Sequence, residues 1–223
     1  MKVYLAMDIK QGKVVWGYRG EREKYEEISR HSEIVSTSSP ESVLSELSPE
    51  RVYIADLDAI RGNRTENLKC LEKVSCEALL DRGYRGKEDV FDDLKLIGRS
   101  NFRPVLGTET YDLNEVFDGV FVSLDFFDTP DSKEVFDLVS RLNSFSLEGV
   151  IVLDVRRVGT GKVNFGLVEE VISISDNPVY VGGGVNGLED MDNLKSIGVE
   201  GVIVSTAFHR KKLPLEILRK GFY

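Results

Sequence analysis

Short apolar runs rich in β-branched residues alternate with helix-like segments along the whole chain, giving eight strand-then-helix units. Parallel strands need a crossover helix between them, so this order predicts an α/β fold with a parallel sheet. Eight units favour a closed (β/α)8 TIM barrel, although the pattern alone leaves an open, doubly wound sheet as an alternative. The predicted strands cover residues 3–9, 51–58, 76–81, 102–106, 119–125 and 150–155, and the last two begin at Pro178 and Gly201.

Corresponding residues recur about a hundred positions apart in the two halves of the chain, a spacing typical of an internally repeated fold. The pairs are Asp8 with Asp125, Asp56 with Asp154, Gly83 with Gly184, Glu88-Asp89 with Glu189-Asp190, and Gly107-Thr108 with Ser205-Thr206. This repetition is a second argument for closure, because two half-barrels complete one ring. We therefore predict a single barrel domain over residues 1–223 with a two-fold half-barrel repeat.

The last two predicted strands both end in small residues before a helix-like segment begins. Gly182, Gly183 and Gly184 follow the first of them, and Ser205 and Thr206 follow the second. Glycines let the backbone approach a ligand closely and leave amide groups free to point at an anion. In TIM barrels a phosphate commonly binds between the loops after the last two strands. These five residues are the candidate phosphate site; the alternative is that the glycines only form a tight turn.

The charge of the chain excludes two classes of partner. With a formal charge of −9 and a pI near 4.9, its surface offers no attraction to nucleic acid or to a membrane. Cys70 and Cys76 match no metal or redox spacing, so we expect reduced thiols and no metal site. The first residues reach a carboxylate too soon for a signal peptide, and no apolar run approaches the length of a membrane span. We expect a cytoplasmic protein.

Several segments, spread over nearly the whole chain, match one known pattern in order. They are the strand ending in Asp8 with Gly12-Lys13-Val14-Val15, Asp56-Leu57-Asp58 with Asn63-Arg64 and Asn67-Leu68, Leu106-Gly107-Thr108, Gly182-Gly183-Gly184-Val185, and Gly201-Val202-Ile203-Val204. In these residues the chain resembles the histidine-biosynthesis barrels, a family that comprises an aminoimidazole carboxamide ribotide isomerase and its cyclase sister. The resemblance implies a repeated barrel with two phosphate sites, one in each half, for a substrate with a phosphate at each end.

The resemblance also implies a pair of catalytic aspartates, Asp8 and Asp125, at the positions of the family's two acidic catalysts. The isomerase performs an Amadori rearrangement, in which a general acid opens an aminoaldose ring and a base removes the C2 proton. By the resemblance we assign Asp8 as general base and Asp125 as general acid, with no metal or organic cofactor. The alternative is that both are strand-end carboxylates that cap neighbouring loops.

Several positions depart from the family pattern. The family usually carries an arginine where this chain has Trp16, and polar residues where it has Leu153 and Val158. Asp81 and Arg82 replace two glycines of the first-half phosphate site. Asp81 would repel a phosphate, whereas Arg82 would either offset this charge or pair with it and fill the site.

The part of the substrate site that the first half of the chain forms is therefore less well defined. Candidates for a second phosphate, or for another part of the substrate, are Gly83, Arg85, Gly107, Thr108 and Trp16. If the substrate differs from that of the family, Trp16 and Tyr84 are candidates to stack on its ring. We infer one firmly held phosphate and a smaller or differently shaped other end.

The leading hypothesis is a cofactor-independent isomerase that acts on a phosphoribosyl or related sugar-phosphate substrate. One alternative is a paralogue in another pathway, with lyase, cyclase or condensation chemistry on a phosphorylated metabolite. Another is a barrel that binds phosphate without catalysis. The expected partner is a phosphorylated small molecule, and no oligomeric state is predicted. A polar, glycine-containing loop over residues 156–162 is long enough to act as a lid.

Overall fold

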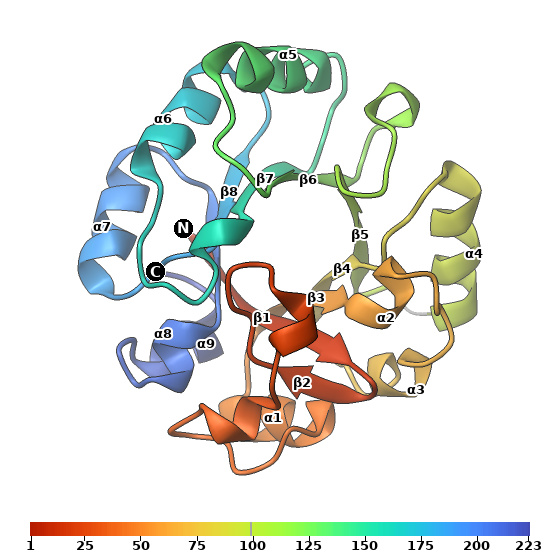
Figure 1. Cartoon of the computed structure of the whole chain (residues 1–223), viewed down its shortest axis with the longest axis vertical. Coiled ribbons are helices and arrows are strands. Elements are labelled where there is room, and N and C mark those ends of the chain that lie inside the picture. Colours follow the sequence, from red (N-terminus) through yellow and green to blue (C-terminus); the bar gives the residue numbers. More distant parts are fainter. Residues whose placement is uncertain (99) are drawn as a thin grey trace.

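The computed structural model describes residues 1–98 and 100–223 and shows a ring of eight parallel strands with helices around the outside (Figure 1). The strands follow one another around the ring in chain order, and β1 pairs with β9 to close it. The barrel strands are β1 (Lys2–Lys10), β3 (Arg51–Asp56), β4 (Glu77–Asp81), β5 (Phe102–Gly107), β6 (Phe121–Phe126), β7 (Gly149–Asp154), β8 (Val179–Gly182) and β9 (Gly201–Val204). The predicted closed (β/α)8 barrel is confirmed.

Parallel register brings the carboxyl ends of all these strands to one rim. The closing pair runs from Lys2 opposite Gly201 to Leu5 opposite Val204, and Asp8 lies opposite Ala55 on the next strand. Side chains at the last positions of the strands therefore meet around one opening, where barrel enzymes place their active sites.

β2 (Lys13–Val15) lies outside the ring as an antiparallel partner of β1. Gln11 and Gly12 have φ values of +51° and +73°, and a tight hairpin turn of the primed type needs positive φ at both positions. The hairpin and the loop after it lie beside the barrel opening (red to orange in Figure 1).

The helices cover the outside of the ring and fill the connections. The α-helices are α1 (Pro40–Leu47), α2 (Leu57–Ile60), α3 (Leu68–Leu71), α4 (Lys87–Ile97), α5 (Ser132–Leu142), α6 (Phe165–Ile174), α7 (Leu188–Ser196), α8 (Thr206–His209) and α9 (Leu215–Lys220). Short 3-10 turns are η1 (Arg22–Lys24), η2 (Ile28–Arg30), η3 (Leu113–Glu115) and η4 (Val155–Arg157). None of the described helices has the length and hydropathy needed to cross a bilayer.

Between β3 and β4 the chain forms two short helices, α2 and α3, rather than one continuous helix. Asp56 caps α2 immediately after β3, because its side chain accepts the Ala59 amide at 3.1 Å. Gly62, with φ of +102°, then turns the chain out of helical geometry. A helix of 4 residues such as α2 is too short to show helical periodicity in the sequence.

The amino-terminal end of the barrel is plugged by aromatic side chains. The Tyr180 ring packs edge-on against Phe121 at a centroid distance of 5.2 Å. Gly149 and Gly201 leave space for it, since a Cβ at either position would lie 2.5 Å from the Tyr180 ring. The Tyr180 hydroxyl accepts a hydrogen bond from Lys2 Nζ at 3.1 Å. These side chains fill the amino-terminal end of the barrel, opposite the rim where the strands end.

The two halves of the barrel repeat specific contacts as well as strands. Asp56 ends β3 and accepts a hydrogen bond from Asn67 at 2.6 Å, and Asp154 ends β7 and accepts one from Asn164 at 3.0 Å. The first turns of α4 and α7 also correspond. The amide of Arg85 donates to the Asp89 carboxylate at 2.9 Å, and the amide of Asn186 donates to the Asp190 carboxylate at 2.7 Å.

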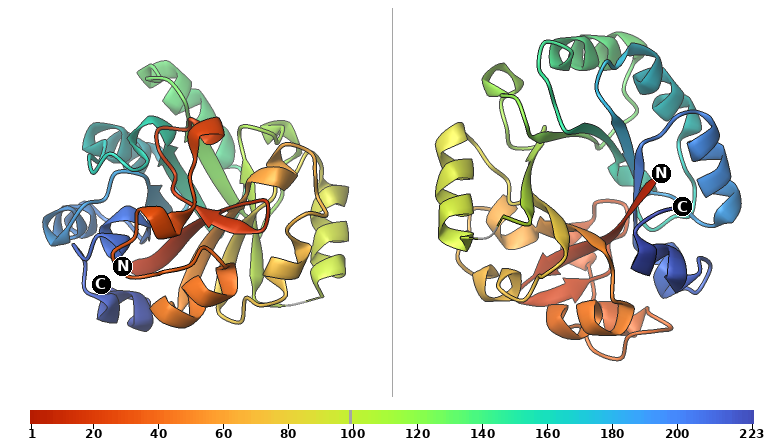
Figure 2. Two further views of the ribbon diagram at one scale, coloured as in Figure 1. Left: turned by 60° about the horizontal axis from the view of Figure 1, so that its bottom comes forward. Right: turned by 180° about the vertical axis from the view of Figure 1, so that it is seen from behind.

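The chain ends lie together on the side away from the opening. The view from behind the barrel shows both termini close to one another (Figure 2, right). The amino group of Met1 donates to the backbone oxygen of Tyr223 at 3.1 Å, and Lys2 forms a β-bridge with Phe222. The opposite, carboxyl-terminal rim of the barrel is therefore built by the loops between elements.

Candidate active site

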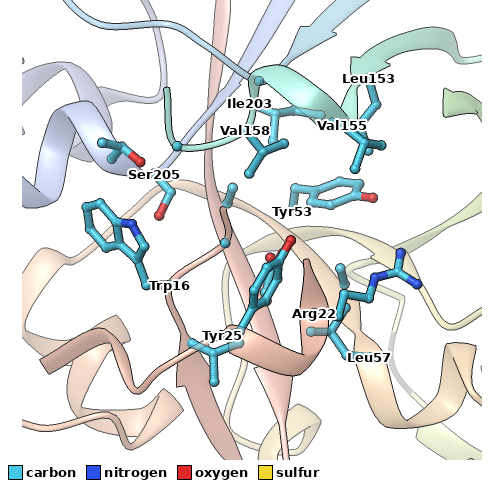
Figure 3. Close-up of a pocket in the computed structure, with 18 of the residues that line it drawn as sticks. Trp16, Arg22, Tyr25, Tyr53, Leu57, Leu153, Val155, Val158, Ile203 and Ser205 are labelled. Atoms are coloured by element: carbon cyan, nitrogen blue, oxygen red, sulfur yellow. The ribbon is translucent and has the colours of Figure 1, made fainter. Parts of the chain in front are cut away.

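A cavity lies at the carboxyl-terminal rim of the barrel, where the loops after the strands converge (Figure 3). Acidic side chains reach it from three strands, and apolar side chains form much of its wall. The polar residues lining it include Asp8, Asp81, Asp125, Glu109, Arg22, Ser205 and Thr206, and the apolar ones include Leu57, Ile60, Leu153, Val155, Val158 and Ile203. Both aspartates of the predicted catalytic pair thus face one cavity.

Asp8 reaches the cavity from β1. Gly17 leaves room for its side chain, because a Cβ at that position would lie 2.8 Å from Oδ2 of Asp8. Among residues 1–98 and 100–223 no hydrogen bond holds this carboxylate. Burial raises the pKa of Asp8 to about 6, while the charge of Arg22 acts in the opposite direction. At neutral pH the group is mostly ionised and available as a proton acceptor.

Asp125 enters from β6 and is held by two donors. Its Oδ1 accepts the Ser123 hydroxyl at 2.6 Å, and its Oδ2 accepts the Glu109 amide at 3.3 Å. Burial, and then the charge of Asp81, raise the pKa of Asp125 to about 7, against the effect of these hydrogen bonds. Near neutral pH a large fraction of this group is protonated and can donate a proton.

Asp81 is a third carboxylate, placed close to Asp125 at the end of β4. Its Oδ1 accepts the Gly83 amide at 2.9 Å, and its Oδ2 accepts the Tyr53 hydroxyl at 3.4 Å. A Cβ on Gly107 would lie 2.8 Å from Asp125 Oδ2 and 3.4 Å from Asp81 Oδ2. Burial raises the pKa of Asp81 to about 6, although the Gly83 hydrogen bond lowers it. The sequence marked Asp81 only as a departure from the family pattern.

An ion pair joins two loops at the cavity. The guanidinium of Arg22, in η1, donates to both carboxylate oxygens of Glu109 at 2.6 Å each. Such two-point pairing between an arginine and a carboxylate is strong and directional. Sequence reasoning missed both residues, because Arg22 lies in a charged, irregular segment and Glu109 in a loop, and neither segment has a recognisable spacing.

The glycine turn after β8 borders the opposite side of the cavity. Gly183 and Gly184 line it with φ values of +92° and +88°, which favour glycine over any other residue. The turn lies close to the loop after β7: a Cβ on Gly183 would meet the Asp154 carbonyl oxygen at 2.8 Å, and one on Gly184 would clash with the Lys162 carbonyl. Gly182 lies one residue earlier, in β8, against the side chain of Leu153.

Several backbone amides at this end of the cavity are free. Among the described residues, no turn or loop hydrogen bond is donated by the amides of Gly183, Gly184, Ser205 or Thr206. Ser205 and Thr206 also bring hydroxyl groups to the lining. Free amides and hydroxyls concentrated at one end of a cavity are suited to an anion.

The residues predicted for the other end of the substrate lie in a different arrangement. Gly83 packs against the backbone of Ile60, and Arg85 donates to the carbonyl oxygens of both residues at 3.1 Å. The Thr108 hydroxyl accepts the Asp125 amide at 2.9 Å. In the part of the chain that the structure describes, Gly83, Arg85, Gly107 and Thr108 are not among the lining residues. A second phosphate at this end stays a prediction.

Trp16 does line the cavity, but beside the glycine-turn end. Figure 3 shows its ring next to Ser205. The indole stacks on the His31 ring at a centroid distance of 5.2 Å, and the guanidinium of Arg210 lies 5.2 Å from the indole ring. The contacts with His31 and Arg210 therefore fix the position of the indole ring, which presents an apolar surface next to the candidate phosphate site.

Two expectations about neighbouring side chains are wrong. Arg82 does not pair with Asp81; it is fully buried and binds Asp56 at 3.0 Å and Asp93 at 2.8 Å. Tyr84 is also fully buried, so it cannot stack on a ligand in the cavity. In a parallel strand end, successive side chains point to opposite sides, and the carboxylate of Asp81 takes the inner side.

The loop after β7 covers part of the opening. The Arg19 amide donates to the Val158 carbonyl oxygen at 3.1 Å, and Gly159 lies against the backbone of Gly17. Val155 and Val158 thereby become part of the cavity wall. No group of three or more histidine, cysteine, aspartate or glutamate side chains among the described residues is arranged to hold a metal ion.

Comparison with known proteins gives a consistent result over the chain. A family model described as "Histidine biosynthesis protein" matches residues 2–214. An uncharacterized protein of Methanocaldococcus jannaschii is 31% identical over 239 residues, which cover 100% of this chain and 99% of that protein. A bis-phosphoribosyl imidazole-4-carboxamide isomerase of Thermococcus onnurineus is 26% identical over 98% of this chain and 97% of its own. A second such isomerase, from Photorhabdus laumondii, is 28% identical over 74% and 73%, respectively.

Proposed function

The chain belongs to the histidine biosynthesis protein family, and from this relationship we propose that it is an isomerase-type enzyme acting on a phosphorylated sugar or aminosugar. The observation that carries the proposal is the presence of Asp8 and Asp125 in one cavity whose far end carries the glycine turn. The relatives named as isomerases act on a compound with two phosphoribosyl groups, which supports a phosphorylated substrate.

The two aspartates have the properties that the proposed acid and base need. Asp125, with a pKa of about 7, donates a proton to the ring oxygen as the C1–O bond of the aminoaldose breaks. Asp8, with a pKa of about 6, then removes the proton from C2 of the resulting iminium ion. The enolamine becomes the aminoketose when the ionised Asp125 accepts the proton of the C2 hydroxyl and the protonated Asp8 returns a proton to C1. After these two transfers Asp125 is again protonated and Asp8 is again ionised, as at the start of the cycle.

The phosphate of the substrate binds at the glycine turn in this proposal. Amides of Gly183 and Gly184 and the hydroxyls of Ser205 and Thr206 supply its hydrogen bonds. Access of water to the reacting carbons is limited on two sides in this proposal. The ion pair between Arg22 and Glu109 covers one side, and the loop after β7 covers another.

The test is turnover of the bis-phosphoribosyl imidazole-4-carboxamide and of simpler N-substituted ribosylamine 5-phosphates, followed by NMR. Loss of turnover in Asp8→Asn and Asp125→Asn, with phosphate affinity retained, is the expected result. Glu169→Gln, an exposed change on α6, is the matched control for loss of one negative charge. Full activity in Asp8→Asn would overturn the assignment of the base.

A second candidate function is different chemistry on a phosphorylated metabolite, as in a paralogue serving another pathway. The position of Asp81 favours it, because this carboxylate occupies the end of the cavity where the family resemblance implies a phosphate. Expression in a histidine auxotroph that lacks the isomerase separates the two candidates. Growth supports the isomerase, whereas phosphate binding without growth supports the paralogue.

A further inference from the structure

We propose that the end of the cavity around Asp81 and Asp125 binds a positively charged nitrogen, so that the substrate is a phosphomonoester with an amino or amidino group at its far end. This inference rests on the proposed function in one respect, the binding of the phosphate at the glycine turn. It goes beyond it by assigning the chemistry of the substrate's other end.

The first observation is the direction of the carboxylate oxygens. The Oδ1 atoms of Asp81 and Asp125 are occupied by the Gly83 amide at 2.9 Å and the Ser123 hydroxyl at 2.6 Å. The Oδ2 atoms of both residues accept longer hydrogen bonds, from the Tyr53 hydroxyl at 3.4 Å and the Glu109 amide at 3.3 Å, and both lie near the Cβ position that Gly107 leaves empty. Two neighbouring carboxylates that line one cavity, each with further lone pairs to accept from, suit one ammonium or amidinium group.

The second observation is the balance of charge. Four carboxylates line the cavity, those of Asp8, Asp81, Asp125 and Glu109. Among the described lining residues, the cationic side chain is Arg22, and its guanidinium is engaged by both oxygens of Glu109. In the part of the lining that the structure describes, Asp8, Asp81 and Asp125 form no ion pair, although the charge of Arg22 acts on Asp8 and Asp81 from a distance, and burial strengthens the field of these carboxylates. A second phosphate would be repelled here, whereas a cation would be attracted.

The third observation is that the donors needed for a second phosphate are used elsewhere. The Gly83 amide is taken by Asp81, and the Arg85 guanidinium is taken by the carbonyl oxygens of Gly83 and Ile60. The Thr108 hydroxyl, which accepts from the Asp125 amide, is not among the described lining residues of the cavity. Among the described residues, the donors of Gly83, Arg85 and Thr108 that the family resemblance implies for a second phosphate thus do not face the cavity.

Much of the cavity wall is apolar, and this limits which chemical group can connect the anionic and cationic ends of the ligand. Leu57, Ile60, Leu153, Val155 and Ile203 line the cavity, together with Tyr25 and Tyr53. Figure 3 shows Leu153, Val155 and Ile203 on the side opposite Leu57. A carbon skeleton or a ring fits between such walls better than a second charged group. The ligand that we propose for this cavity is therefore bipolar, with an anionic group at one end and a cationic group at the other.

The experiment is calorimetry with two matched series of ligands. One series runs from aminopropyl to aminohexyl phosphate, and the other contains the hydroxyalkyl phosphates of the same lengths. We expect the best amino ligand to bind at least about tenfold more tightly than its hydroxyl counterpart. The measurements are made near pH 8, where carboxylates with pKa values of about 6 to 7 are ionised.

Substitution at Asp81 identifies the part of the site responsible. Asp81→Asn keeps an oxygen for the Gly83 amide and removes the charge, so we expect the preference for the amino series to fall to nearly equal affinities. The hydroxyalkyl phosphates should bind this variant at least as well as the native protein. Glu169→Gln is the matched control, and Ser123→Ala, which frees Asp125 Oδ1, is a second variant in case the first does not fold. We expect Ser123→Ala to retain the preference for the amino series.

Each outcome separates this inference from the proposed function. If both series bind equally to the native protein, the cationic end is wrong and phosphate binding stands. If an alkane bisphosphate of matching length binds more tightly than the amino ligands, the cationic end is also wrong. If neither series nor inorganic phosphate binds, the proposed phosphate end fails, and the inference falls with it.

Discussion

Asp81 and Asp125, which are far apart in the sequence, direct their Oδ2 atoms toward the same empty position on Gly107, at 3.4 Å and 2.8 Å from where a Cβ would lie. Parallel strands β4, β5 and β6 are neighbours in the ring, so their ends bring these three residues together. The missing side chain on the middle strand allows two carboxylates to share one space. Because of this arrangement, the charge of Asp81 affects the pKa of Asp125, the proposed general acid. In the sequence, Asp81 stood out only as a departure from the family pattern.

Gly107→Ala should therefore disturb the site without changing any charge. A Cβ 2.8 Å from Asp125 Oδ2 would push that carboxylate out of place, and we expect kcat/KM to fall by about tenfold to a hundredfold. The measurement is steady-state turnover together with urea unfolding. Gly166→Ala is the control, because a Cβ there meets nothing within 4 Å. Equal activity of the two variants would contradict the assigned geometry.

The pH profile of kcat/KM should be a narrow bell. The base Asp8 must be ionised, so activity falls as pH drops below about 6; the acid Asp125 must be protonated, so activity falls as pH rises above about 7. In Asp81→Asn the upper limb should move to lower pH, because the charge of Asp81 no longer raises the pKa of Asp125. An upper limb that does not move would show that the two carboxyl groups are not coupled.

Asp81→Asn should also stabilise the fold at high pH. The pKa of Asp81 is raised from 3.8 to about 6, so its contribution to stability is present below about pH 4 and is lost as pH rises through 6. Replacing the carboxylate removes this cost, and we expect a gain of about 1 to 3 kcal/mol near pH 8 and little change near pH 4. Urea unfolding at both pH values tests this. Destabilisation at pH 8 would contradict it.

The ion pair between Arg22 and Glu109 should hold two loops together over the cavity. A double-mutant cycle with Arg22→Gln and Glu109→Gln should give a coupling energy of about 1 kcal/mol in urea unfolding, because the pair has two bonds and is only partly exposed. The exposed pair Lys133–Asp137 is the control, with an expected coupling below about 0.5 kcal/mol. KM should rise in both Arg22 and Glu109 variants. Similar coupling in the two pairs would argue against a closing role.

Gly184→Ala should abolish phosphate binding. A Cβ at this position would clash with the backbone of Lys162, and φ of +88° is unfavourable for alanine. We expect the affinity for inorganic phosphate, measured by calorimetry, to fall by about a hundredfold, together with a loss of stability of about 1 to 3 kcal/mol. In Gly187→Ala, three residues along, a Cβ meets nothing, and native affinity is expected. Unchanged binding in Gly184→Ala would place the phosphate elsewhere.

The barrel and its repeat could be predicted from sequence because each depends on local patterns. Eight apolar strand runs separated by helices leave few topologies, and residues such as Asp56 and Asp154 recur at equivalent strand ends. The rim positions of Asp8, Asp125, Gly183 and Ser205 follow in turn, since parallel strands present their carboxyl ends on one side.

The opposite end of the cavity depended on contacts that no spacing encodes. Arg82 and Asp81 are adjacent in sequence, yet one is buried against Asp56 and Asp93 while the other faces the cavity. Likewise Arg22 meets Glu109 from a segment with no periodicity. The sequence by itself determined the ring, its repeat and which residues reach its rim, because hydrophobic period and chain order specify these. Only the tertiary structure decided which charges are paired, buried or left facing the cavity, because that balance is set by neighbours from distant strands.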